Sequence, residues 1–223
     1  MPRQSRESGQ MAMDTALSNL RISNHPLVRH KLAHMRGPGL SSQQFYRLMK
    51  EVGMLLAHEV TADLANEPDE QGQGLGILTG RKPAIVPVLR SGLAMAEGMR
   101  EVMPSFRTGH LGLLQDENHQ PREYLIALPK TAGRIFIVVD AVIATGNNAM
   151  RAIEILKDYH AEEENILFCV LMATDEGARG LLDAHPKARI YAGHLGTFDH
   201  ETKKTVPYFG DVGNRLFFGD QRS

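Results

Sequence analysis

The residues best suited to chemistry lie in the run IFIVVDAVIATGNN, from Ile135 to Asn148. Asp140 follows an almost uninterrupted apolar stretch, and Thr145 and Gly146 precede a predicted helix. A loop that leads into a helix N-terminus presents unpaired backbone N–H groups and the positive end of the helix dipole, and this geometry binds phosphate. Thr145 adds a hydroxyl donor, and Gly146 lets the backbone approach the anion. Asp140 is placed to orient a ribose hydroxyl or to hold a metal through water.

The same run also has a purely structural explanation, in which Asp140 caps the following turn and Thr145 caps the helix. It is not a Walker loop, because the Gly-Lys-Ser/Thr ending is absent. It also lacks the spaced glycines of a dinucleotide-binding fold. By itself, the run predicts an anion-binding strand, loop and helix, and leaves the ligand open.

The elements that must position this loop alternate between buried strands and helices, which indicates an α/β fold with a mostly parallel central sheet flanked by helices. Ligands bind at the carboxyl ends of such strands, so Arg90, Gln115, Asp140 and the segment after Gly193 are candidate site residues. Strands are predicted at 84–89, 108–115, 135–140, 165–173 and 188–194, and helices at 91–103, from the loop to about 159, and at 176–185.

The N-terminal part of the chain is less regular. Residues 1–18 are polar and mixed in charge, and we expect a disordered lead-in before a single domain at 19–223. Ser41 or Ser42 is expected to cap a helix that fades near Asn66, because apolar residues recur at three- and four-residue spacing. The segment 67–82 predicts a loop or a short, poor hairpin. The helical apolar positions are Phe45, Leu48, Met49, Val52, Leu55 and Leu56.

Composition excludes several classes of function. The 223 residues carry a formal net charge of -1, which gives no general attraction to nucleic acid or to anionic membranes. No apolar stretch reaches the roughly 18 residues that span a bilayer, and no secretory signal is visible. The single cysteine, Cys169, is expected in the core of a protein in a reducing, cytoplasmic compartment. His30 and His34 can share a helix face, but without cysteine or carboxylate partners they do not predict a metal site.

Four blocks of the sequence, in order, resemble the uracil phosphoribosyltransferase family. They are ISNHPLVRHKLAHMR (22–36), VPVLRSGLAMAEGM (86–99), VVDAVIATG (138–146) and VPYFGDVGNRLF (206–217). The resemblance implies a type I phosphoribosyltransferase fold with a hood from the N- and C-terminal segments. It also implies transfer of a phosphoribosyl group from 5-phosphoribosyl 1-diphosphate to uracil, giving UMP and pyrophosphate in pyrimidine salvage. Mg²⁺, activation by GTP and a homodimer or higher homo-oligomer are further implications.

Position by position, the resemblance also implies roles for single residues. Arg90, Asp140 and Asp211 would be catalytic, with Arg90 and Asp211 contacting the donor. Magnesium would be held mainly through the donor diphosphate, with no direct side-chain ligand. The base would be read by Thr205, Gly210, Asp211 and Val212. The rest of the donor site would be formed by Gln115, Asp140, Ala141, Val142, Ile143, Ala144, Thr145, Gly146, Asn147 and Asn148.

The sequence departs from the family pattern at several of these places. Gln115 stands where the family usually has an arginine, Ala141 replaces a proline, and Asn147 and Asn148 replace Gly and Ser or Thr. Two alternatives therefore remain open: a relative that acts on another base, and a weakly active or non-catalytic nucleotide-binding relative. Further differences are Tyr208 and Phe209, which can stack on a base or fill its pocket, and the short segment 67–82. The resemblance also suggests that 117–130 is a hairpin flap over the donor.

Overall fold

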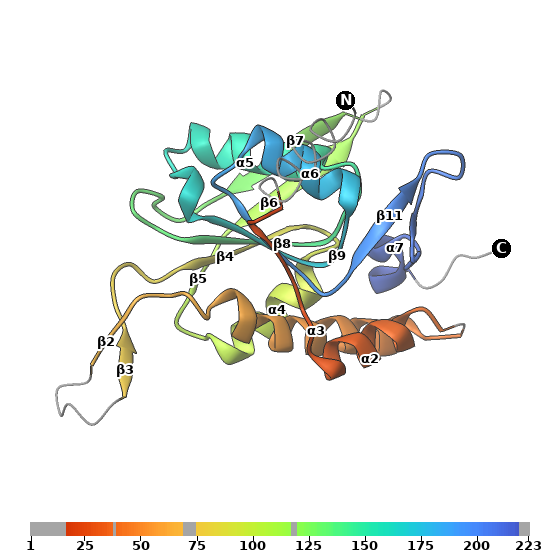
Figure 1. Cartoon of the computed structure of the whole chain (residues 1–223), viewed down its shortest axis with the longest axis horizontal. Coiled ribbons are helices and arrows are strands. Elements are labelled where there is room, and N and C mark those ends of the chain that lie inside the picture. The colour runs from red at the N-terminus through yellow and green to blue at the C-terminus, as the bar shows by residue number, and fades with distance from the viewer. Residues whose placement is uncertain (1–16, 38, 69–74, 117–119, 219–223) are drawn as a thin grey trace, which may run out of the picture.

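The computed structural model describes residues 17–37, 39–68, 75–116 and 120–218. Most of the lead-in expected at 1–18 lies outside the described residues, and only Leu17 and Ser18, in the turn before the first strand, fall within them. Two layers of helices enclose a central sheet (Figure 1), so the predicted α/β class is confirmed. One face carries α5 (Asn147–Asp158) and α6 (Asp175–Ala184), and the other carries α2 (Pro26–Met35), α3 (Ser42–Val60) and α4 (Leu93–Val102).

Seven strands of the described residues form the main path of the sheet. They are β1 (Leu20–Ile22), β4 (Ala84–Leu89), β6 (His110–Gln115), β7 (Pro121–Ala127), β8 (Phe136–Ile143), β9 (Ile166–Thr174) and β10 (Arg189–Ala192). Their order is β1-β10-β9-β8-β4-β6-β7, and every neighbouring pair is parallel except β6 and β7. The hairpin expected at 117–130 is therefore present as β7 folded back on β6, although 117–119 lie outside the described residues.

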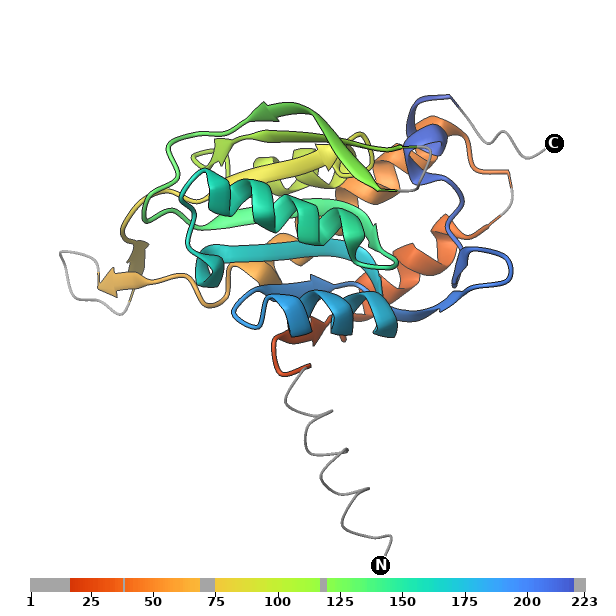
Figure 2. The ribbon, with the colours of Figure 1, turned by 90° about the horizontal axis from the view of Figure 1, so that it is seen from above.

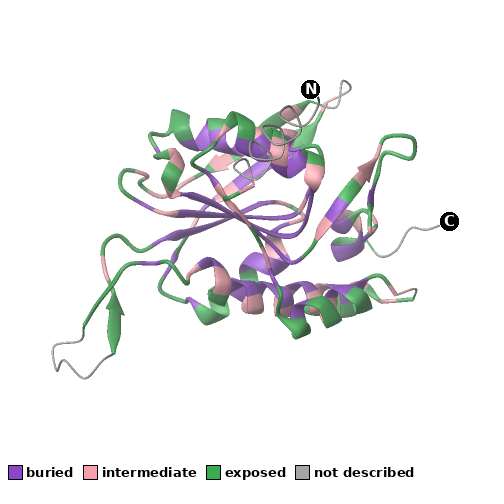
Figure 3. Cartoon of the chain, in the orientation of Figure 1, coloured by how far each residue is buried: buried purple, intermediate pink, exposed green. Residues whose placement is uncertain are grey.

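The central strands are apolar because both of their faces are covered. β9 is buried at all nine positions, and β8 is buried everywhere except at Val142. Figure 3 shows this buried band running through the middle of the molecule. Cys169 is fully buried within β9, which confirms its prediction as a core residue.

Helix α3 begins as predicted but ends early. Ser41 is its N-cap, and the side chain of Gln44 completes a capping box. The helix ends at Val60 and does not continue to Asn66, because the Thr61 hydroxyl bonds the Ala57 carbonyl and the chain then turns. The turn leads into an antiparallel ribbon of β2 (Asn66–Pro68) and β3 (Gly76–Leu78), which projects from one end of the molecule (Figure 1). The short hairpin predicted within 67–82 is thus confirmed.

The strand predicted at 108–115 is interrupted. β5 (Arg107–Thr108) pairs with the start of β4, and β6 pairs with its end. Gly109 separates them, and its N–H bonds the carbonyl of Ile85 at 3.0 Å. A side chain there would meet the Ala127 carbonyl oxygen at 2.9 Å, so the close approach of β7 favours glycine at this break.

Several short elements near the C-terminus had no periodic signal in the sequence. β11 (Leu195–Asp199) pairs with β9 and with β12 (Lys204–Val206), and α7 (Val212–Phe217) follows. These elements lie at the opposite end of the molecule from the β2–β3 ribbon, as Figure 2 shows from above. The Asp211 carboxylate caps α7 by accepting the Asn214 N–H at 2.9 Å. This cap lets a helix of six residues form where length alone does not predict one.

Candidate phosphate-binding site

A small cavity lies where β4, β6, β8 and β9 approach the start of α5. Its volume is about 60 Å³, so it suits one phosphate-sized group and not a whole nucleotide. The structure thus brings Gln115 of β6 together with the loop that the sequence singled out. The lining residues are Val88, Gln115, Asp140, Val142, Ile143, Ala144, Thr145, Gly146, Asn147, Asn148, Ala149 and Phe168.

The loop meets α5 with its N–H groups available. Gly146 is the N-cap residue, with φ +86°, and no side chain caps the helix. The alternative in which Thr145 caps the helix is therefore wrong. The first four backbone N–H groups of a helix have no acceptor within the helix, and the oxygens of an anion can accept their hydrogen bonds. A left-handed φ also favours glycine at position 146.

Residues at the start of α6 support this loop from behind. The Thr174 hydroxyl bonds the Ala144 carbonyl and accepts the Gly177 N–H at 2.9 Å. A side chain at Gly177 would lie 2.3 Å from the Ala144 carbonyl oxygen, so only glycine fits. Neither Thr174 nor Gly177 was predicted from the sequence. A threonine directly before the acidic pair Asp175 and Glu176 is a helix N-cap signal that was available.

Asp140 does not end its strand, contrary to the sequence prediction. β8 continues to Ile143 because Val142 and Ile143 still pair with β9. The Asp140 carboxyl is 8% exposed, and its Oδ1 accepts the Ser91 hydroxyl and the Ala141 N–H, the latter at 2.7 Å. Burial raises the pKa of this carboxyl to about 6, although both hydrogen bonds act to lower it. The backbone N–H of Ala141 contributes to the site, while its side chain packs in the core.

Three of the departures from the family pattern meet in this cavity. Gln115, Asn147 and Asn148 all line it, and Asn148 Oδ1 is buried without a hydrogen-bond partner among the described residues. A carbonyl oxygen would repel phosphate, whereas the amide nitrogen can donate to it. Asn148 would therefore support anion binding only through its NH₂ group.

Arg90 lies outside this cavity and contacts α7. Its Nη2 donates to Asn214 Oδ1 at 3.2 Å, and its guanidinium carbon is 4.8 Å from the ring centre of Phe218 and 5.8 Å from that of Phe217. Asn214 also donates to Asp211 Oδ2 at 3.0 Å. The structure thus groups Arg90 with Asp211 through Asn214, which the sequence analysis did not identify.

The predicted base-binding residues extend from β12 to α7: Thr205 lies in β12, Gly210 and Asp211 lie in the turn before α7, and Val212 is the first residue of α7. The Thr205 hydroxyl donates to the Pro207 carbonyl at 3.1 Å, and Gly210 has φ +80°. Arg215 is 3% exposed and donates to the carbonyl of Phe209 at 2.6 Å, which fixes the turn from inside. Arg215 was not predicted from the sequence. Thr205 and Val212 are buried, whereas Asp211 is exposed.

The two aromatic residues before this turn point to different environments. Phe209 is 2% exposed and belongs to the core between the sheet and α2, α3 and α4, so it fills the interior and is not free to stack on a base. Tyr208 is 44% exposed, and Lys204 Nζ lies 5.2 Å from its ring centre. Only Tyr208 remains available to a ligand.

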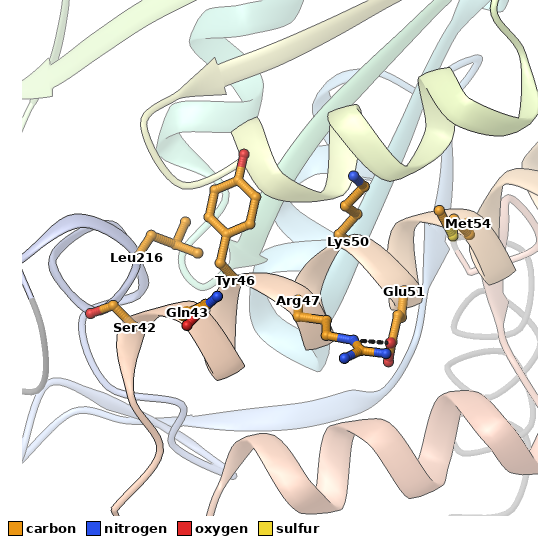
Figure 4. A pocket seen from close by; sticks show the side chains of 8 residues that line it. All are labelled: Ser42, Gln43, Tyr46, Arg47, Lys50, Glu51, Met54 and Leu216. Atoms are coloured by element: carbon orange, nitrogen blue, oxygen red, sulfur yellow. Dashed lines mark hydrogen bonds and ion pairs between the residues drawn. The ribbon is translucent and has the colours of Figure 1, made fainter.

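A wider hollow of about 580 Å³ on α3 does not fit an anionic ligand (Figure 4). Its cations are already neutralised. Lys50 Nζ lies 3.0 Å from Glu97 and 2.5 Å from Glu101, and Arg47 Nε lies 3.0 Å from Glu51. None of the predicted site residues line it. The lining residues are Ser42, Gln43, Tyr46, Arg47, Lys50, Glu51, Met54 and Leu216.

The described histidines and Cys169 do not form a metal-binding cluster. His30 and His34 share one side of α2, as expected, with ring centres 4.4 Å apart. In the described part of the chain, no group of three His, Cys, Asp or Glu side chains is placed to hold a metal ion. Burial raises the pKa of the Cys169 thiol, which therefore stays protonated. Among the described helices, none has the length and apolar character to cross a membrane.

Comparison with known proteins agrees with this geometry. The family model described as uracil phosphoribosyltransferase matches residues 22–219. A protein named uracil phosphoribosyltransferase from Paraburkholderia xenovorans is 40% identical over 93% of this chain and 98% of its own length, and one from Ralstonia pickettii is 39% identical over the same shares. The solved structure of the AQ2163 protein from Aquifex aeolicus superposes with a TM-score of 0.80 at 25% identity, covering 89% of this chain and 97% of that one. The chain belongs to the uracil phosphoribosyltransferase family.

Proposed function

We propose that this protein transfers the phosphoribosyl group of 5-phosphoribosyl 1-diphosphate to uracil, with UMP and pyrophosphate as products. The observation that carries the proposal is that α5 begins without a side-chain cap, at a cavity that Asp140 also lines. The family model matches residues 22–219, which include this cavity. The cavity suits the 5-phosphate of the donor, because backbone N–H groups converge on a space of phosphate size. Asp140, on the wall of the same cavity, is placed for the ribose hydroxyls.

The reaction displaces diphosphate from the anomeric carbon, so positive charge develops on the sugar and negative charge on the leaving group. No side-chain nucleophile is required, and the protein mainly positions the two substrates. Arg90 supports the leaving group, because a forked guanidinium binds phosphate oxygens with two hydrogen bonds. Its contact with Asn214 brings the diphosphate position close to the base-reading turn.

Magnesium is part of the proposal as a companion of the donor diphosphate. When bound, it would neutralise charge on the departing diphosphate. The chemistry of the site fits a metal held mainly by phosphate oxygens and water. Both oxygens of Asp211 are already engaged by Asn214, so this carboxylate has little freedom to serve as a direct ligand. Arg90 and Asp211 would then contact the diphosphate and the water molecules around the metal, and not the metal itself.

The base is read by the turn from Thr205 to Val212. Uracil presents a carbonyl, an N–H and a second carbonyl in line, which backbone N–H and C=O groups complement. Cytosine would leave a buried donor or acceptor unpaired, and such mismatches discriminate strongly. Phe209 shapes this turn from the core, which keeps its ring away from the base.

The test is a turnover assay with a panel of bases. Purified protein with donor, Mg²⁺ and uracil is expected to release pyrophosphate and form UMP. Asp140→Asn should reduce kcat at least about a hundredfold, because it removes the charge next to the ribose, while the exposed Asp158→Asn should retain activity. Donor binding without turnover of uracil would reject the proposal, and faster turnover of another base would establish the alternative substrate.

Three further features rest on the family resemblance and belong to the same proposal: a homo-oligomer, activation by GTP, and a cytoplasmic location. Exposed apolar side chains on and beside β3 support the first, since Leu75, Ile77 and Leu78 are 53–68% exposed on a projecting ribbon. Light scattering is expected to give at least a dimer, and a monomer would contradict the proposed homo-oligomer.

Turnover measured with and without GTP tests the proposed activation by GTP. Fractionation of cells tests the proposed cytoplasmic location.

A further inference from the structure

Ser91 lies between the two halves of the site. It follows Arg90, whose guanidinium contacts α7, and its hydroxyl donates to Asp140 Oδ1 in the cavity. Ser91 is half-buried. It is thus the one residue among those described that bonds the Asp140 side chain from another element.

The turn around Ser91 is held tightly against β8. The Gly92 N–H bonds the Val88 carbonyl at 2.9 Å, and a side chain at Gly92 would lie 2.0 Å from the Val139 carbonyl oxygen. The neighbour of Ser91 therefore packs directly on the residue before Asp140. This packing fixes the backbone of the turn that carries Ser91 against the strand that carries Asp140.

The two oxygens of the Asp140 carboxyl differ in their surroundings. Oδ1 accepts both the Ser91 hydroxyl and the Ala141 N–H. In the described residues, Oδ2 has no protein hydrogen bond assigned to it, while Asp140 as a whole lines the cavity. One oxygen is thus fixed by the protein, and the other is left for a substrate hydroxyl.

We propose that Ser91 is a positioning residue that fixes the Asp140 carboxylate for the ribose of the donor. The inference rests on the proposed function. Its action is indirect: Ser91 bonds Oδ1, and this sets the rotamer in which Oδ2 meets the substrate. A hydroxyl donor also favours the ionised carboxyl over the protonated one.

The pH dependence provides a readout that a merely structural serine would not change. Burial raises the pKa of Asp140 to about 6, and the Ser91 hydrogen bond lowers it. Removing Ser91 therefore raises this pKa further. No charged side chain of the described residues contributes to the shift, so the hydroxyl is the main side-chain group that opposes burial. If the ionised carboxylate is required, the acid limb of kcat/KM must move to higher pH.

The experiment compares Ser91→Ala, Ser91→Thr and wild type from pH 5 to 9, with kcat and KM for the donor measured separately. Ser91→Ala is expected to move the acid limb up by about one pH unit. It should also raise the donor KM severalfold at pH 8.5, where Asp140 is ionised in both proteins. Ser91→Thr keeps the hydroxyl and should restore the wild-type limb. Ser105→Ala, at an exposed serine remote from Asp140, is the matched control.

Calorimetric donor binding across the same pH range gives a second readout. Wild type that neither binds the donor nor turns over would reject the proposed function. Active wild type with an unshifted acid limb in Ser91→Ala would overturn the role of Ser91 alone. If Ser91→Ala does not fold, Ser91→Cys, a weaker donor of similar size, makes the same test, and an unshifted limb there would also overturn it.

Discussion

At the scale of single residues, the cavity at the start of α5 is polar, and the described residues that line it include no cation. Gln115, Asn147 and Asn148 line it, and in the proposed function the donor phosphate would be bound by backbone N–H groups. Neutral donors hold a phosphate more weakly than a guanidinium does, because charge-assisted hydrogen bonds are about twice as strong. We therefore expect that replacing the neutral side chain of Gln115 by a cation increases the affinity for the donor.

Gln115→Arg is expected to tighten donor binding at least about tenfold, because a hydrogen bond between charged groups contributes about 1.5–3 kcal/mol. Calorimetry with 5-phosphoribosyl 1-diphosphate and Mg²⁺ measures the effect. Gln120→Arg is the matched control, since it adds the same charge nearby without lining the cavity. Equal gains in both variants would attribute the effect to net charge and not to a contact with the diphosphate.

At the scale of elements, α7 links Arg90, which we propose binds the donor, to the turn that we propose reads the base. Asp211 caps it, Asn214 bonds Arg90, and Phe218 follows its last turn with its ring 4.8 Å from the Arg90 guanidinium carbon. A guanidinium over an aromatic face is stabilised by about 0.5–1 kcal/mol at exposed sites. The helix thus limits the orientations that Arg90 can adopt before the donor binds.

Phe218→Ala is expected to raise the donor KM about two- to fivefold, the range that corresponds to this stacking energy. Phe218→Tyr keeps the aromatic face and should behave like wild type, whereas Phe218→Leu keeps apolar volume alone and should resemble the alanine variant. Steady-state kinetics at saturating uracil distinguish them. Wild-type behaviour of Phe218→Leu would show that volume, and not the ring face, positions Arg90.

At the scale of the whole molecule, Glu163 joins three elements away from the site. It lies in the 3₁₀ turn η1 (Glu163–Asn165), and its carboxylate accepts Lys157 Nζ at 2.8 Å, lies 3.1 Å from His185 Nδ1 and accepts the Lys187 N–H at 3.2 Å. Burial raises the pKa of this carboxyl, but the three partners together lower it to about 2. The contacts hold the end of α5, the end of α6 and the start of β10 together.

A carboxyl with a folded pKa of about 2 stabilises the protein fully above its unfolded pKa, near 4.3, and loses this contribution as the pH falls toward 2. Glu163→Gln should therefore lower the free energy of unfolding at pH 7 by about 1–3 kcal/mol. The difference from wild type should shrink between about pH 4.5 and 2. Denaturant titrations measure it, with the exposed Asp158→Asn as control. A difference that stays constant over this range would contradict the assignment.

The sequence by itself determined the α/β class, the central strands and the position of the loop that we propose binds phosphate. These features depend on short-range patterns: a run buried on both faces must be apolar, as in β9, and a loop before a helix leaves its N–H groups unpaired. A cap at Ser41 or Ser42 could be predicted for the same reason, since a cap involves residues only three apart, and the structure shows it at Ser41. The resemblance to a family then supplied the ligand, which these patterns alone left open.

Only the tertiary structure decided what surrounds each functional group. Whether β8 stops at Asp140 or continues to Ile143 depends on its pairing with β9. Because the strand continues, Asp140 is buried within it, and burial raises the pKa of its carboxyl. The contact of Arg90 with Asn214 joins residues 124 positions apart, and that of Ser91 with Asp140 joins residues 49 apart. No local period encodes such pairs, because they arise when separate elements pack against one sheet. The sequence could therefore predict the loop that we propose binds phosphate, but only the tertiary structure could show which side chains contact Asp140 and Arg90.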